Sequence, residues 1–62
     1  MKRADLMKQL RALAKETGQP YSETEGGSHT KVCIGNKRTV VPRHKEINEM
    51  TAKSIIKQVK GE

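Results

Sequence analysis

The sequence predicts an α+β fold in which a helix at each end of the chain flanks a group of short β-strands. Apolar residues recur at spacings of three and four in both terminal segments, which is the period of an amphipathic helix. Between them the pattern changes to two β-rich segments around a two-residue turn. A chain of 62 residues has room for one small core, so we expect a single domain over residues 1–62.

The first helix is predicted over residues 4–17. Its apolar stripe consists of Leu6, Leu10, Leu13 and Ala14. Gly18 follows directly and Pro20 comes two residues later. This order is typical of a helix end, because glycine accepts the left-handed conformation and proline cannot continue a helix.

A β-hairpin is predicted from residues 30–34 and 37–41. Gly35-Asn36 between them suits a type II′ turn, since glycine occupies the position that needs a positive φ. Residues 20–25 are polar and could add a third strand at an edge of the sheet.

Side-chain alternation across this turn predicts two different faces of the sheet. One face is apolar and available to the helices, and it carries Val32, Ile34, Thr39 and Val41. The other faces solvent or a ligand, and it carries His29, Lys31, Cys33, Arg38 and Val40.

The second helix is predicted near the C-terminus, with Asn48 as the N-cap and Gly61 at its end. Its apolar stripe consists of Ala52, Ile55, Ile56 and Val59. Lysines in its outer face and last turns complement the negative end of the helix dipole.

The charge balance favours a polyanionic partner such as nucleic acid. Lys and Arg number 13 against 7 Asp and Glu, a formal net charge of +6 on a small surface. The single cysteine, Cys33, cannot form an internal disulfide, which favours a reducing cytoplasm. No apolar run approaches the roughly 18 residues of a membrane span, and no signal peptide is evident, so we expect no membrane partner.

The segment Gly26-Gly27-Ser28-His29 is the strongest candidate for chemistry, because two small residues deliver an imidazole to the start of a strand. Histidine can donate or accept a proton near neutral pH, as acid-base cleavage of RNA requires. A surface histidine after a plain glycine turn is the competing interpretation. Ser28 is assigned to turn geometry or a phosphate contact, because adjacent strand residues point to opposite faces.

The remaining candidates have structural interpretations. His44 lies in the connection to the second helix and is expected to be structural or solvated. Cys33 is expected to be a small strand residue, and together with the two histidines it lacks zinc-site spacing, so no metal or cofactor is predicted. Met7 and Met50 are assigned to the core or a helix face rather than to a binding surface.

Taken in order, several segments resemble the HicA toxin family. They are the Leu-rich first helix, Gly27-Ser28-His29, the strand 30–34, the stretch 39–47 and the helix end 55–58. The resemblance implies a fold like the double-stranded RNA-binding domain, α-β-β-β-α, with both helices on one face of a three-stranded antiparallel sheet. It also implies translation-independent cleavage of mRNA, a HicB-type antitoxin that covers the active site, and an essential histidine at His29.

We hypothesise metal-free attack of a ribose 2′-hydroxyl on the neighbouring phosphate, with His29 as general acid or base. The candidate RNA contacts are Ser28, Lys31, Lys37, Arg38 and Arg43. A noncatalytic double-stranded RNA-binding module and a small protein-interaction domain are the alternatives. Acidic Glu46 and Glu49 near the start of the second helix disfavour the former, because that helix start would have to face phosphates.

Overall fold

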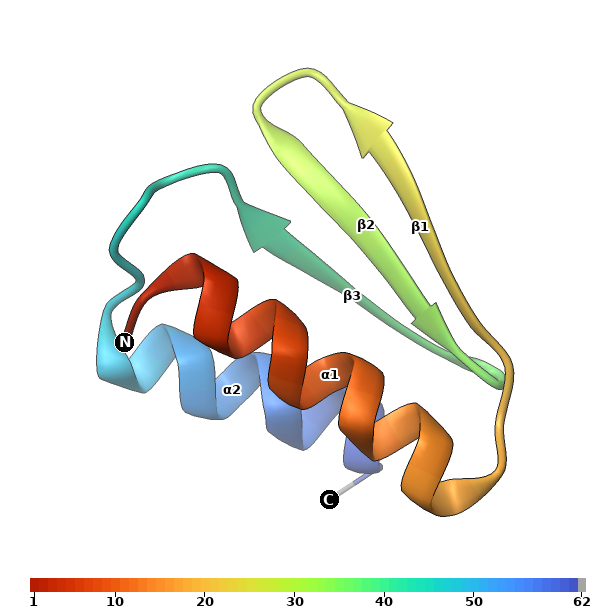
Figure 1. Cartoon of the computed structure of the whole chain (residues 1–62). Helices are drawn as coiled ribbons and strands as arrows, with labels where there is room; N and C mark the ends of the chain where they lie inside the picture. The colour runs from red at the N-terminus through yellow and green to blue at the C-terminus, as the bar shows by residue number, and fades with distance from the viewer. Residues whose placement is uncertain (62) are drawn as a thin grey trace.

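The computed structural model describes residues 1–61 and contains two helices and three strands in the predicted order (Figure 1). The elements are α1 (Arg3–Thr17), β1 (Tyr21–Gly26), β2 (His29–Ile34), β3 (Lys37–Pro42) and α2 (Glu49–Lys60). The α-β-β-β-α order of an α+β fold is therefore confirmed.

The three strands form one antiparallel sheet in the order β1-β2-β3. Ile34 pairs with Lys37, so the loop between β2 and β3 contains only Gly35 and Asn36, as predicted. Gly35 has a φ of 61°, and no described residue other than glycine has a positive φ. This combination agrees with a type II′ turn and excludes type I′, which needs a positive φ at both positions.

Strand β1 extends over six residues, from the pairing of Tyr21 with Ile34 to that of Gly26 with His29. The third strand expected at residues 20–25 is thus present, shifted by one residue. Only Tyr21 is partly buried, so the backbone ladder and charged side-chain contacts hold this polar strand in place.

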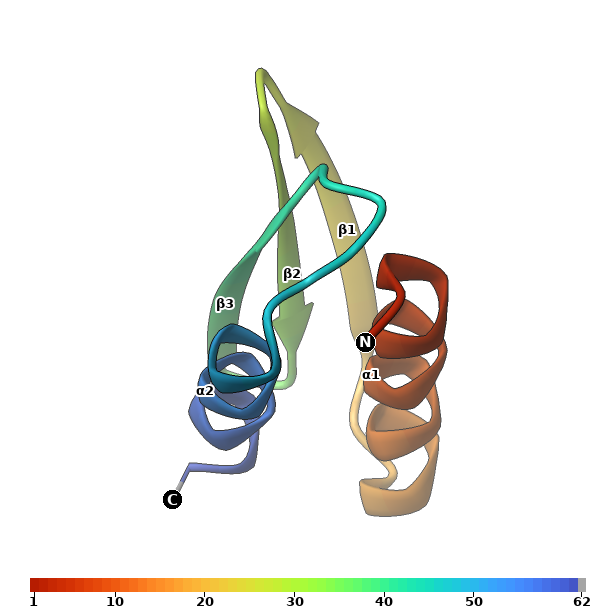
Figure 2. The ribbon, with the colours of Figure 1, turned by 90° about the vertical axis from the view of Figure 1, so that its left-hand side faces the viewer.

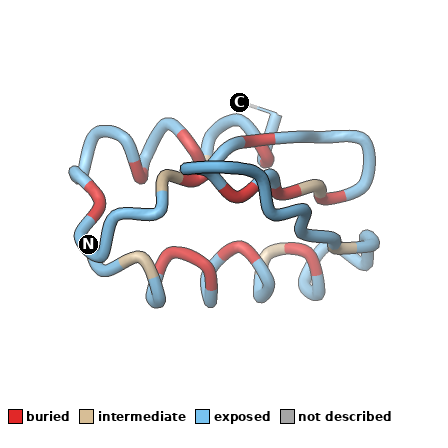
Figure 3. Tube along the Cα trace, turned by 90° about the horizontal axis from the view of Figure 1, so that it is seen from above, coloured by how far each residue is buried: buried red, intermediate tan, exposed pale blue. Residues whose placement is uncertain are grey.

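Both helices pack on one face of the sheet, with α1 beside β1 and α2 beside β3 (Figure 2). The predicted inward residues of the hairpin are all buried there, and Figure 3 shows the buried positions facing the interior between helices and sheet. The core consists of Leu6, Met7, Leu10, Ala14, Val32, Ile34, Val41, Ile47, Ala52, Ile55 and Val59. The opposite face of the sheet is left uncovered by the described residues.

The helix ends follow the predicted chemistry. Gly18 and Gly61 adopt the left-handed conformation, and the Asn48 side chain accepts a hydrogen bond of 2.8 Å from the backbone nitrogen of Met50. Helix α1 has no side-chain cap; instead the backbone N–H of Arg3 donates to the carbonyl of Lys45 at 2.9 Å. Among residues 1–61, neither helix has the length and apolar character needed to cross a membrane.

Candidate functional site

His29 is the first residue of β2, and its side chain is exposed on the uncovered face of the sheet. Its neighbours across the two ladders are Gly26 on β1 and Pro42 on β3. Paired residues share a face, so the β1 side of the imidazole borders a position without a side chain. The ring is therefore accessible to a ligand from that side.

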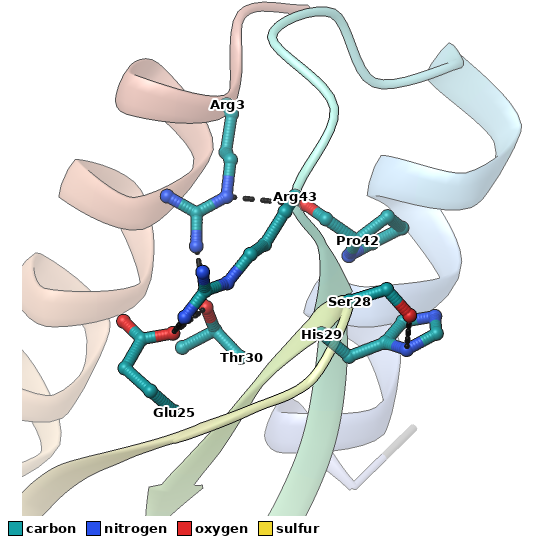
Figure 4. A network of polar contacts seen from close by, with 7 residues as sticks. All are labelled: Arg3, Glu25, Ser28, His29, Thr30, Pro42 and Arg43. Carbon is teal, nitrogen blue, oxygen red and sulfur yellow. Dashed lines mark hydrogen bonds and ion pairs between the residues drawn. The ribbon is translucent and has the colours of Figure 1, made fainter.

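The Ser28 hydroxyl oxygen lies 3.1 Å from Nδ1 of His29, as Figure 4 shows. The expectation that these side chains point apart is wrong, because Ser28 belongs to the two-residue turn with Gly27 and is not subject to strand alternation. A hydroxyl can donate to an unprotonated nitrogen and accept from a protonated one. Ser28 can consequently hold the ring in either protonation state, with Nε2 left for another partner.

A charged network lies on the other side of the same strand end (Figure 4). Arg3 donates through Nε to the carbonyl of Pro42 at 3.1 Å and through a terminal nitrogen to Oγ1 of Thr30 at 2.5 Å. Thr30 donates in turn to the Glu25 carboxylate at 2.8 Å, and Arg43 donates to the same carboxylate oxygen. The network thus joins α1 to the ends of all three strands directly behind His29.

Glu25 is the acceptor at the centre of this network. The hydrogen bond from Thr30, followed by that from Arg43, lowers the pKa of its carboxyl below the ordinary value. The carboxylate therefore remains ionised to lower pH than an ordinary glutamate, and through Thr30 it holds the turn-proximal end of β1 against β2.

Sequence reasoning missed Arg3, Glu25 and Thr30 as residues that position this end of the sheet. Arg3 and Thr30 are 27 positions apart, so no local pattern joins them. The only available signal is a threonine at an inward strand position, since a buried hydroxyl needs hydrogen-bond partners.

The predicted phosphate contacts divide between the two faces. Lys31 is the next residue after His29 on the uncovered face. Arg38 is paired with Cys33 on the same face, roughly 13 Å from His29 along the strand direction. Lys37 pairs with Ile34 at the far end of the sheet and shares the helix-covered side. Arg43 points to Glu25 and not to the His29 side (Figure 4).

The structure also places the two other residues that were weighed from the sequence. His44 is exposed in the connection between β3 and α2, and Cys33 is half-buried on the uncovered face. Across residues 1–61, no three His, Cys, Asp or Glu side chains gather in a way that could hold a metal ion.

A family model described as HicA toxin of bacterial toxin-antitoxin matches residues 7–60. The chain belongs to the HicA toxin family. The match spans the region from the first helix to the end of the second and includes the Ser28-His29 turn. Membership makes this HicA chain the toxin of a toxin-antitoxin system, with a cognate antitoxin as its partner. No curated protein and no solved structure matches it.

Proposed function

We propose that this HicA toxin is an endoribonuclease that cleaves mRNA independently of translation, with His29 as its general acid-base. The observation that carries the proposal is the exposed imidazole of His29 on the uncovered sheet face, beside Gly26, which has no side chain to block it. The positive charge of the chain supports an RNA substrate, because it draws a polyanion to the surface.

In the proposed reaction the ribose 2′-oxygen attacks the adjacent phosphorus, and the bond from phosphorus to the 5′-oxygen breaks. The 2′-hydroxyl proton passes to Nε2 of His29, the departing 5′-oxygen takes up a proton from water, and His29 later returns its proton to the solvent. The products are a 2′,3′-cyclic phosphate and a 5′-hydroxyl. Because the nucleophile belongs to the substrate and the histidine transfers the proton, the step requires no metal ion.

Ser28 and Lys31 are the polar residues that the uncovered face offers closest to His29 in sequence. With His29 as the base, the Ser28 hydroxyl oxygen accepts from the protonated Nδ1, which leaves Nε2 unprotonated and able to accept the proton of the substrate. Lys31 supplies positive charge for the phosphate oxygens as negative charge builds up on them. Arg38, further along the face, contacts the RNA backbone away from the scissile linkage. Lys37 and Arg43 contribute to the general positive potential.

A HicB-type antitoxin is the proposed regulator. A partner that covers the uncovered face of the sheet would block access to His29 without altering the fold of the toxin. Binding there would inhibit through exclusion of mRNA, so inhibition should be competitive with RNA.

Inducible expression of the wild type and of His29→Ala tests the proposal, with His44→Ala as the matched control because His44 is the other histidine of the chain and is exposed in the connection between β3 and α2. We expect growth arrest and mRNA cleavage from the wild type and from His44→Ala. Loss of the general acid-base should slow cleavage by about 10²–10⁴-fold in His29→Ala. Growth arrest that persists in His29→Ala, or products without a 2′,3′-cyclic or derived 3′-phosphate, would contradict the mechanism.

A further inference from the structure

A groove of about 860 Å³ lies at the β3 edge of the sheet, between strand residues and α2, and His29 is not among its lining residues. Its lining joins residues of the uncovered sheet face to residues of α2 across the edge strand β3. The sheet side is formed by Thr24, Lys31, Cys33, Arg38, Thr39 and Val40, and the helix side by Met50, Thr51, Ser54, Ile55 and Gln58. Its volume is within the range of small-molecule binding sites.

The walls of the groove combine exposed apolar surface with positive charge. Val40 and Met50 are the large apolar side chains most exposed on the described surface, at 46% and 78%, and both line it. Lys31 and Arg38 contribute two cations, and among residues 1–61 the lining contains no acidic side chain. Such a groove suits a ligand that is apolar on its faces and attached to anionic groups.

The groove begins one two-residue step from the proposed catalytic residue. Lys31 follows His29 on the same face, roughly 6.6 Å along the strand, and Lys31 is already part of the groove wall. An RNA strand with its scissile phosphate at His29 would therefore have a neighbouring nucleotide at this opening. The hydroxyls of Thr51 and Ser54 lie on the helix wall, and a hydroxyl can either donate to or accept from a base edge.

The geometry points to a nucleobase subsite in this groove, which takes an unpaired base flanking the cleaved linkage and thereby makes single-stranded RNA the substrate class. This inference rests on the proposed function and adds to it the form of RNA that is bound. Val40 and Met50 contact the faces of the base, and Lys31 and Arg38 contact the backbone. A base within a duplex is excluded, because both of its faces are stacked on neighbouring base pairs.

The experiment uses His29→Ala as the parent, so that binding is measured without cleavage. Fluorescence anisotropy compares a short labelled single-stranded oligoribonucleotide with a duplex of the same sequence. Ser54→Phe fills the groove from the exposed surface of α2, and Gln9→Phe places the same side chain on the exposed surface of α1, outside the groove. We expect Ser54→Phe to weaken single-strand binding about tenfold, the size of the loss of one base contact, and Gln9→Phe to leave it within about twofold.

The single cysteine gives a second readout without any substitution in the groove. Cys33 lines the groove and is half-buried, so a bound base should slow its alkylation by N-ethylmaleimide. An oligonucleotide with abasic sites should protect less than the intact one, although its backbone charge is the same.

Three outcomes would overturn the subsite: unchanged binding by Ser54→Phe, unchanged Cys33 alkylation with RNA bound, or equal affinity for the duplex. Loss of antitoxin binding by Ser54→Phe with RNA binding retained would identify the groove as a protein interface and would also overturn it. Failure of the proposed cleavage is separate: it would appear as intact RNA with wild-type protein, while groove protection in the His29→Ala parent persists.

Discussion

Replacement of Thr30 by valine tests whether the network behind His29 stabilises the fold. Thr30 is fully buried, and its hydroxyl accepts from Arg3 and donates to Glu25. A hydrogen bond from a charged donor contributes about 1.5–3 kcal/mol, and Arg3 keeps its bond to the carbonyl of Pro42, so the lower end applies. The exposed Glu25 carboxylate can turn to water and adds nothing to this figure. A loss of about 1.5 kcal/mol corresponds to a decrease in Tm of about 6–12 °C for a domain of this size.

The assay is urea and thermal unfolding followed by circular dichroism, with the same substitution at two other threonines. Thr39 is also buried but makes one neutral hydrogen bond, to Gln58 at 2.7 Å, so Thr39→Val should cost about 1 kcal/mol. Thr24 is exposed, and Thr24→Val should stay within about 0.5 kcal/mol of wild type. A Thr30→Val protein as stable as Thr24→Val would refute the argument that the network stabilises this end of the sheet.

Three further perturbations test charge and packing. Because the pKa of Glu25 is lowered in the folded state, its contribution to the free energy of unfolding is complete above about pH 4.3 and is lost as the pH falls through the folded-state pKa. Glu25→Gln should therefore flatten the acid limb of a curve of Tm against pH. An unchanged acid limb would contradict this. Burial, followed by the hydrogen bond to Glu23, raises the pKa of Tyr21, so the protonated phenol stabilises the fold below about pH 10 and this stabilisation is lost as the pH rises through the folded-state pKa. Absorbance titration of the single tyrosine should give a midpoint above 10 in the folded chain. An ordinary midpoint would argue against burial of the phenol. Leu10 is fully buried, so Leu10→Ala should lower the free energy of unfolding by about 2–5 kcal/mol, a large part of the stability of so small a domain. Saturating antitoxin should raise the Tm of this variant and of wild type by several degrees, because it binds the folded state. A Tm that antitoxin leaves unchanged would count against linked binding.

The parts of the fold that depend on local pattern could be predicted from the sequence. Gly35-Asn36 determined the register of the hairpin, and from that register the two faces followed, including the exposed position of His29. Asn48 was identifiable as a cap because its side chain acts on a residue two positions away. Each of these depends on residues within one element or one turn.

The parts that depend on distant residues could not be predicted. Strand β1 is almost entirely polar, and its length is determined by pairing with β2 rather than by its own composition. Ile47 belongs to the core although it stands alone in a polar connection with no apolar period around it. The Ser28–His29 contact arises because a turn residue escapes strand alternation, which a pattern of alternating positions does not anticipate.

The composition of β1 has a consequence for self-association. This strand forms one edge of the sheet, and edge strands can pair with other chains. Glu23 and Glu25 point to its inner side, where Arg11 pairs with the former and Arg43 with the latter. A second sheet that stacked or paired here would have to take these carboxylates out of water or away from their arginines. The polar edge therefore opposes fibril-like assembly, in which the unpaired backbone N–H and C=O groups of β1 would pair with a strand of another chain.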